Sequence, residues 1–156
     1  MNMTKKQNYL IFSLILCASS IVLIILILSA NRKNSESGKV ALGIKGRVLS
    51  ADIALTDTAR EKGLSGRDKI GENEAMLFIF QSDEIRNFWM KDMKFAIDII
   101  WVDSSRRIIG VTSNARPESW PDLFPSPAPV RYVIEVPAGW TAKQGDLVGQ
   151  IVHWQQ

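Results

Sequence analysis

Asp98 and Glu135 are carboxylates that interrupt apolar segments of this chain. Asp98 lies in the run 96–102, which is apolar on both faces if it forms a strand. A carboxylate in such a strand is costly unless a cation pairs with it or donors bond to it. If the two carboxylates faced one cleft, they would suit the general acid and base of a hydrolase. Because the sequence does not set their separation, a carboxylate-based hydrolase stays an alternative.

Two cations are expected to lie near these carboxylates. Strand alternation places Arg131 and Glu135 on one face of the segment 130–136, and Lys91 follows closely after Trp89. We therefore predict a ligand-binding cluster of Trp89, Lys91, Asp98, Arg131 and Glu135. Buried polar groups beside an aromatic platform suit a small polar ligand, such as a sugar. The alternative is a salt-bridge network that only holds the strand register.

Other catalytic chemistries have few residues to use. His153 is the only histidine and Cys17 the only cysteine, so a nucleophilic triad or a histidine-rich zinc site is not expected. The sequence also shows no Asp-x-Asp calcium pattern and no glycine-rich phosphate loop. We predict no metal, no cofactor and no assigned catalytic residue, and whether the protein is an enzyme stays open.

Charge is distributed unevenly along the chain. From residue 40 onward there are 14 Lys and Arg side chains and 15 Asp and Glu side chains, whereas the whole chain has a net charge of +3. The positive charge therefore belongs to the N-terminal part, where it suits anionic lipid headgroups. Because the rest has no basic excess, nucleic-acid binding is not expected.

The segment 9–30 contains no charged side chain. A helix of about 20 apolar residues spans a bilayer, and the usual signal-peptide core is shorter. We predict a transmembrane signal-anchor at 9–30, after a tail at 1–8 and before a polar tether at 31–39. With Lys5 and Lys6 on the cytoplasmic side, the domain at 40–156 would be extracytoplasmic. The opposite orientation stays an alternative, because Arg32 and Lys33 follow the segment.

Short strand patterns dominate the domain. They are rich in β-branched and aromatic residues and are bounded by turn residues; they cover 49–55, 75–80, 86–90, 97–102, 107–112, 130–136 and 147–154. One short helix is expected between an N-cap at Thr56 and a stop at Gly63. This pattern predicts an all-β fold, either a compact sandwich or a partly open barrel.

A proline-rich segment stands apart from these strands. The range 116–129 holds five of the six prolines, together with Trp120 and Phe124. Proline lacks the backbone donor, so we predict a loop that does not pair as a strand. The loop would either dock a neighbouring protein through Trp120 and Phe124, as in a structural accessory of a membrane complex, or plug one end of the barrel.

Three blocks occur in an order that resembles one family. They are Phe88-Trp89-Met90-Lys91, Ile97-Asp98-Ile99 and the segment 131–140, which reads RYVIEVPAGW. Over residues 44–154 the chain is similar to the family called domain of unknown function 192. The resemblance implies a compact, mostly β, exported domain, and it implies no activity. Arg106 stands where the family usually has a turn glycine.

These observations lead to one functional hypothesis. We expect a membrane-tethered extracytoplasmic β-domain that binds a small polar ligand, an envelope glycan or a neighbouring envelope protein. The predicted partners are thus the lipid bilayer, through 9–30, and one of these ligands.

Overall fold

The computed structural model describes residues 38–155. The secondary-structure elements are β1 (Lys39–Ile44), β2 (Arg47–Ala54), α2 (Asp57–Lys62), β3 (Glu74–Glu84), β4 (Asn87–Phe88), β5 (Ile97–Val102), β6 (Ile108–Ala115), the 3-10 helix η1 (Pro117–Ser119), β7 (Phe124–Pro125), β8 (Val130–Pro137), α3 (Trp140–Gln144) and β9 (Val152–His153). The predicted anchor at 9–30 lies outside these residues. Within 38–155, no helix combines the length and the apolar character needed to cross a membrane.

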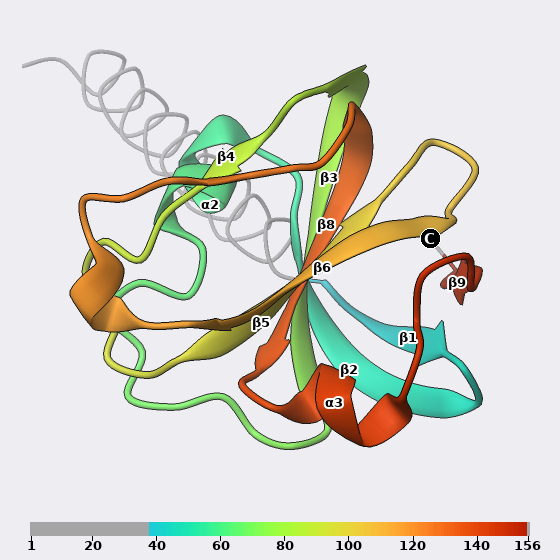
Figure 1. The fold of residues 1–156 in the computed structure, drawn as a ribbon, viewed down its shortest axis with the longest axis horizontal. Coiled ribbons are helices and arrows are strands. Elements are labelled where there is room, and N and C mark those ends of the chain that lie inside the picture. The colour runs from blue at the N-terminus through green and yellow to red at the C-terminus, as the bar shows by residue number, and fades with distance from the viewer. Residues whose placement is uncertain (1–37, 156) are drawn as a thin grey trace, which may run out of the picture. The chain divides into compact units, whose positions relative to one another are not determined.

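One seven-stranded sheet organises the domain, in the order β6-β5-β8-β3-β2-β1-β9 (Figure 1). Neighbouring strands are antiparallel except for β2 and β3, which are parallel and are connected through α2. The two edge strands approach each other at one end, where Arg107 bridges to Ile151 and the Val152 amide donates to the Arg106 carbonyl at 2.9 Å. The sheet therefore curls into a partly open barrel, and the predicted all-β fold is confirmed.

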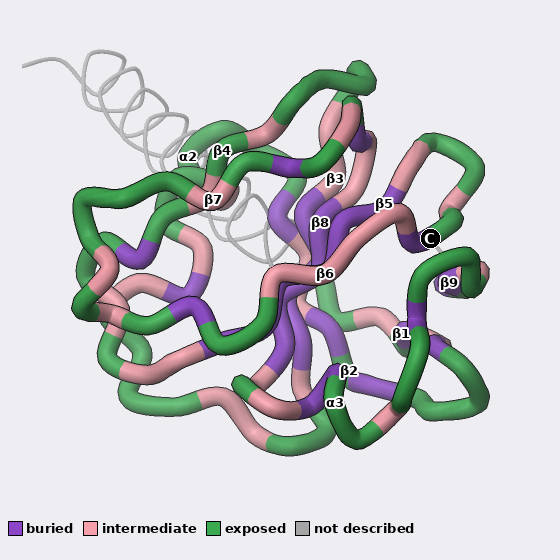
Figure 2. The backbone as a smooth tube through the Cα atoms, in the orientation of Figure 1, coloured by how far each residue is buried: buried purple, intermediate pink, exposed green. Residues whose placement is uncertain are grey.

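Each face of the sheet carries its own apolar cluster. The first cluster includes Leu77, Ile100 and Ile134, and the second includes Phe78 and Ile99. The central strand β5 is buried along its whole length, and Figure 2 shows the buried residues concentrated along the middle strands. Successive side chains of a strand point to opposite faces of the sheet, so neighbouring residues of one strand belong to different clusters. A one-residue change in register would exchange the two clusters.

The helix α2 was predicted from the sequence, whereas the helix α3 was not. The predicted cap at Thr56 is confirmed, since its side chain accepts from the Ala59 amide, and Gly63 ends α2 with a φ of 49°. The short helix α3 was not part of the prediction. It follows Gly139, whose φ of 79° lies in the left-handed region, and its five residues are too few to show a helical period.

Some predicted boundaries differ from the observed ones. The segment 147–154 forms only the short strand β9. The strand β1 was not predicted, and it begins at Lys39, the last residue of the predicted tether. The prediction that no part of 116–129 pairs as a strand is wrong, because β7 pairs with β4 through Phe124–Phe88 and Pro125–Asn87. Proline removes a donor but leaves its carbonyl, so a two-residue edge ladder tolerates it.

Arg106 occupies the turn where the family resemblance places glycine. Its φ of 65° is one that glycine adopts more readily. The side chain offsets this cost, because the guanidinium lies over the Trp154 ring at 3.9 Å from the centroid and Nη1 donates to the Trp154 carbonyl at 3.1 Å. The arginine therefore holds the C-terminal segment against the turn through these two contacts. A glycine has no side chain that could make them.

Candidate functional site

Glu135 is held in β8 by its two neighbouring strands. It lies opposite Met76 of β3 and Ile99 of β5, and directly opposed residues of a sheet project from the same face. Its side chain therefore belongs to the face of the second apolar cluster. The residue is 5% exposed, and its Oε2 has no hydrogen-bond partner among the described residues. Burial raises the pKa of Glu135 to about 8, while the charge of Arg67 acts in the opposite direction.

Arg86 carries a second unsatisfied atom. Its Nη2 donates to the Ser82 carbonyl at 2.8 Å, its Nη1 lies 3.1 Å from Oε2 of Glu84, and its guanidinium lies 4.1 Å from the centre of the Phe80 ring. The remaining donor, Nε, is buried and has no partner within residues 38–155. The guanidinium is thus fixed in place with one N–H group unused.

Glu135 and Arg86 line the same cavity, which has a volume of about 460 Å³. This volume lies within the usual range of small-molecule sites, about 300–1,000 Å³. The cavity lies between α2 and β4, which Figure 1 shows close to each other. Its lining includes four aromatic side chains, Phe78, Phe80, Phe88 and Trp89, together with charged side chains such as Asp57, Glu61 and Lys62. The site therefore combines aromatic and charged walls, and two of its residues carry unsatisfied polar atoms.

Arg60 connects α2 to the sheet through hydrogen bonds beside this cavity. Its Nη1 donates to the carbonyls of Leu55 and, at 2.9 Å, Ile79, and its Nη2 contacts the Asp57 carboxylate. The guanidinium also lies 5.2 Å from the centre of the Phe80 ring. Because these bonds join the helix to Leu55, the residue that follows β2, and to Ile79 of β3, the helical wall of the cavity is positioned by the barrel itself.

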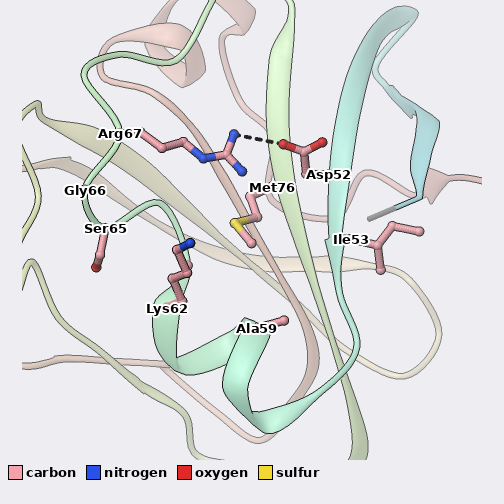
Figure 3. A pocket seen from close by; sticks show the side chains of 9 residues that line it. Asp52, Ile53, Ala59, Lys62, Ser65, Gly66, Arg67 and Met76 are labelled. Atoms are coloured by element: carbon pink, nitrogen blue, oxygen red, sulfur yellow. Dashed lines mark hydrogen bonds and ion pairs between the residues drawn. The ribbon is translucent and has the colours of Figure 1, made fainter. Parts of the chain in front are cut away.

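A smaller hollow is lined by residues of β2, of α2 and of the segment after α2 (Figure 3). It has a volume of about 360 Å³ and shares Lys62, Gly63 and Ser65 with the larger cavity. Figure 3 shows Arg67 directed toward Asp52 across this hollow, with Nη1 2.8 Å from Oδ2. Arg67 is therefore engaged by Asp52, and it forms no ion pair with Glu135.

Asp98 lies on the opposite face of the sheet from Glu135. It is opposite Val136 of β8, a member of the first apolar cluster, and is fully buried. Oδ1 accepts from the Asn114 amide at 2.8 Å, while Oδ2 accepts from the amide and hydroxyl of Thr141 at 3.0 and 2.6 Å. These three bonds join β5 to β6 and to the start of α3, so Asp98 has a structural role.

The other residues of the predicted cluster are dispersed. Arg131 pairs with Asp83, with Nε 2.8 Å from Oδ1. Lys91 is exposed and lines a groove of about 560 Å³ together with Trp89 and Trp120. The structure thus brings Glu135 together with Trp89, and Lys91 together with Trp89. It does not assemble all five residues, and it separates the two carboxylates that the hydrolase alternative requires in one cleft.

The two aromatic residues predicted to dock a partner differ in exposure. Trp120 is 46% exposed and lines the groove beside Trp89. Phe124 is half-buried and packs against the second apolar cluster. They do not form one exposed patch, because the pairing of β7 with β4 turns Phe124 toward the domain.

Arg60, Arg86 and the three phenylalanines of the cavity, Phe78, Phe80 and Phe88, were not among the predicted site residues. Arg86 and Phe80 are separated by a polar stretch in the sequence, and no local spacing indicates that they stack. The one available signal was Glu135 within the apolar segment 132–136. Strand alternation assigns this position to the interior, so a charged residue there indicates a site. The other residues of such a site come from elsewhere in the chain, and folding brings them together.

The fold and the cavity together define a small, partly open β-barrel domain with a ligand-sized cavity between α2 and β4. The chain belongs to the family of domain of unknown function 192, described as an uncharacterized ACR, whose model matches residues 40–154. The family resemblance seen in the sequence is thus confirmed, and the match begins four residues earlier than residue 44.

Curated relatives and solved structures agree with this assignment. A UPF0127 protein of Thermococcus gammatolerans is 32% identical over 114 residues, covering 70% of this chain and 71% of the relative. A crystal structure of a protein of unknown function from Novosphingobium aromaticivorans has a TM-score of 0.69 at 30% identity, covering 76% of this chain and 85% of that one. Another, from Sinorhizobium meliloti, for which a role as a transcription regulator has been suggested, has a TM-score of 0.68 at 29% identity, with coverages of 76% and 93%.

Proposed function

We propose that this domain binds a small molecule in the cavity between α2 and β4, with Glu135 and Arg86 at its polar end. The observation that carries the proposal is that both residues have an unsatisfied buried atom and line one cavity. A buried polar atom without a partner costs about 1–3 kcal/mol. A ligand in this cavity would contact both side chains, and Phe78, Phe80, Phe88 and Trp89 would contribute apolar burial.

Trp89 extends the proposed site toward the surface. It lines both the cavity and the adjacent groove that contains Lys91 and Trp120. A ligand longer than the cavity would therefore continue over exposed aromatic side chains. Of the predicted ligand-binding residues, Trp89, Lys91 and Glu135 keep this role in the proposal, while Asp98 and Arg131 do not.

A thermal-shift screen of the full chain tests this proposal. Small neutral and charged compounds that raise the melting temperature of the wild type are expected to lose most of that effect in Glu135→Leu, because its polar contact is removed. The matched control is Glu118→Leu, a substitution of an exposed glutamate that does not line the cavity. Hits whose shift is unchanged in Glu135→Leu would place binding elsewhere and contradict the proposal.

We also propose that residues 9–30 anchor the chain in a membrane, with the domain on the extracytoplasmic side. The uncharged segment and the flanking cations of the sequence support this. The full chain is expected to stay in the membrane pellet after alkaline carbonate washing. Protease added outside intact spheroplasts should digest the domain, and release by the wash or protection from protease would contradict the anchor or its orientation.

A further inference from the structure

We infer that the groove beside the cavity binds a short, uncharged carbohydrate chain, with its sugar rings packed against Trp89 and Trp120. The groove has a volume of about 560 Å³, a usual size for a small-molecule site. It is a separate volume from the cavity of the proposed function, although Trp89 lines both. A ligand of the groove is therefore additional to a ligand of the cavity, and neither requires the other.

Two exposed tryptophans line the groove. Trp89 is 37% exposed and Trp120 is 46% exposed, whereas the other three tryptophans of the chain are buried. A third residue of the groove, Leu123, is 53% exposed. Large apolar side chains that gather on a surface usually mark a contact with a ligand or a partner. Since both exposed tryptophans line one groove, a ligand that packs against them explains their exposure.

Hydrogen bonds position the residues that line the groove. The Ser65 hydroxyl donates to the Lys91 carbonyl at 2.8 Å. The Gly66 amide donates to the Asp92 carbonyl at 2.9 Å. These bonds join the segment after α2 to the turn that follows β4, and the pairing of β7 with β4 joins the proline-rich loop to the same region. The groove is therefore formed before a ligand binds, which lowers the entropic cost of binding.

The charged side chains of the groove are balanced in sign. Lys62 and Lys91 line it together with Glu61 and Asp92. All four are exposed, and within residues 38–155 none of them takes part in an ion pair. A hydroxyl group donates to a carboxylate and accepts from an ammonium group. A ligand rich in hydroxyl groups can therefore use charges of both signs, whereas a charged ligand would meet repulsion from one pair.

A sugar ring suits both kinds of side chain. Its C–H groups pack against the electron-rich face of an aromatic ring, and its hydroxyl groups lie around the ring edge, where charged side chains can bond to them. A ligand that fills the groove contacts both Trp89 and Trp120. A chain of a few sugar units has the size of the drug-like ligands that such volumes hold.

Two other occupants fit less well. The groove is lined by ten residues, whereas a standard protein interface uses about 20–30 residues a side and its core is poor in charged residues. An anionic lipid surface attracts a patch with an excess of cations, but Glu61 and Asp92 offset the two lysines of the groove. An uncharged carbohydrate chain therefore matches the groove better than a folded protein or an anionic membrane.

Four oligosaccharides of the same length test this inference. Cellotriose and tri-N-acetylchitotriose are uncharged, deacetylated chitotriose carries ammonium groups, and trigalacturonate carries carboxylates. Binding to the full chain, kept in a detergent without a sugar head group, is measured by ligand-observed NMR titration. At least one uncharged trisaccharide is expected to bind with a dissociation constant of about 1 mM or lower, and about threefold or more tightly than either charged one.

Substitutions locate this binding. Trp120→Ala is expected to weaken it about tenfold, whereas Trp120→Phe keeps an aromatic ring and should weaken it by less than about threefold. Because Trp120 is exposed, both variants should melt at the temperature of the wild type. The matched control is Val48→Ala, since Val48 is 67% exposed but does not line the groove. Glu135→Leu, which changes only the cavity, should also leave the affinity unchanged.

The outcomes separate the groove from the cavity. The inference is overturned if neither uncharged trisaccharide binds up to about 10 mM, ten times the expected dissociation constant. Tighter binding of a charged trisaccharide, or equal binding by Trp120→Ala and the wild type, also overturns it. If Glu135→Leu abolishes the binding while Trp120→Ala does not, the sugar occupies the cavity, and only the proposed function stands. If the thermal-shift screen fails while Trp120 is required for sugar binding, the inference stands without the proposed function.

Discussion

Glu135→Gln is expected to make the protein more stable than the wild type above about pH 8 and equally stable near pH 4. Burial raises the folded-state pKa of Glu135 from an ordinary 4.5 to about 8, against the opposing charge of Arg67. Below pH 4.5 the residue is protonated in both folded and unfolded chains. Between 4.5 and about 8 only the unfolded chain ionises, so the wild type loses stability as pH rises. Glutamine does not titrate and avoids this loss.

The expected size of this effect is a few kcal/mol. Each pKa unit corresponds to about 1.4 kcal/mol, so the wild type should lose roughly 3–5 kcal/mol across this interval, and the loss should level off above about pH 8. Urea unfolding of the full chain in a mild detergent, from pH 4 to pH 9, measures the free energy of unfolding at each pH. The difference between wild type and Glu135→Gln isolates this one group, because the other titrating residues are common to both.

Glu61→Gln provides the matched control. Glu61 lines the same cavity but is exposed, so its substitution should leave the pH profile of the wild type nearly unchanged. A profile for Glu135→Gln parallel to that of the wild type from pH 4 to pH 9 would mean that Glu135 is ionised in the folded domain. It would contradict the burial that raises the pKa of Glu135.

Asp98→Ala is expected to destabilise the domain by about 3–5 kcal/mol. The substitution leaves the backbone amides of Asn114 and of the buried Thr141 without the acceptor that they now share. Hydrogen bonds to a charged group contribute about 1.5–3 kcal/mol, and an orphaned buried donor adds its desolvation cost. The measurement is the free energy of unfolding of the full chain at pH 7, by urea titration.

Asp103→Ala is the comparison that isolates burial. Asp103 also accepts three hydrogen bonds, from the Ser105 amide and hydroxyl and from the Arg107 amide, but it lies in a surface turn where water can replace it. Its loss should cost about 1 kcal/mol. If Asp98→Ala does not fold, Thr141→Val removes only the hydroxyl bond and should cost about 1–2 kcal/mol. Equal costs for Asp98→Ala and Asp103→Ala would contradict the structural role.

The two carboxylates thus serve different purposes because their surroundings differ. Asp98 is surrounded by three donors and stabilises the junction of β5, β6 and α3. Glu135 has an atom without any partner and lines a cavity. A buried polar group that is fully bonded indicates a structural element, whereas one left unsatisfied beside an open volume indicates a place for a ligand.

Much of the architecture is visible in the sequence, because the signals for strands and caps are local. The segment 97–102, which is apolar except for Asp98, predicts the fully buried strand β5 with its observed bounds, and Thr56 and Gly63 mark the ends of α2. The family resemblance identifies nearly the whole domain. The strand β1 and the short elements α3 and β7 were missed. The five residues of α3 and the two of β7 carry no usable period, and their stability comes from contacts with the rest of the fold.

By itself, the sequence determined the family, the all-β class and the presence of unusual carboxylates at Asp98 and Glu135. Only the tertiary structure decided that these carboxylates lie on opposite faces, since Asp98 is opposite Val136 and Glu135 is opposite Ile99. The register between β5 and β8 sets this relation. Alternation along one strand says which residues share a face, but a shift of one residue between two strands exchanges the faces, and the sequence of neither strand specifies that shift.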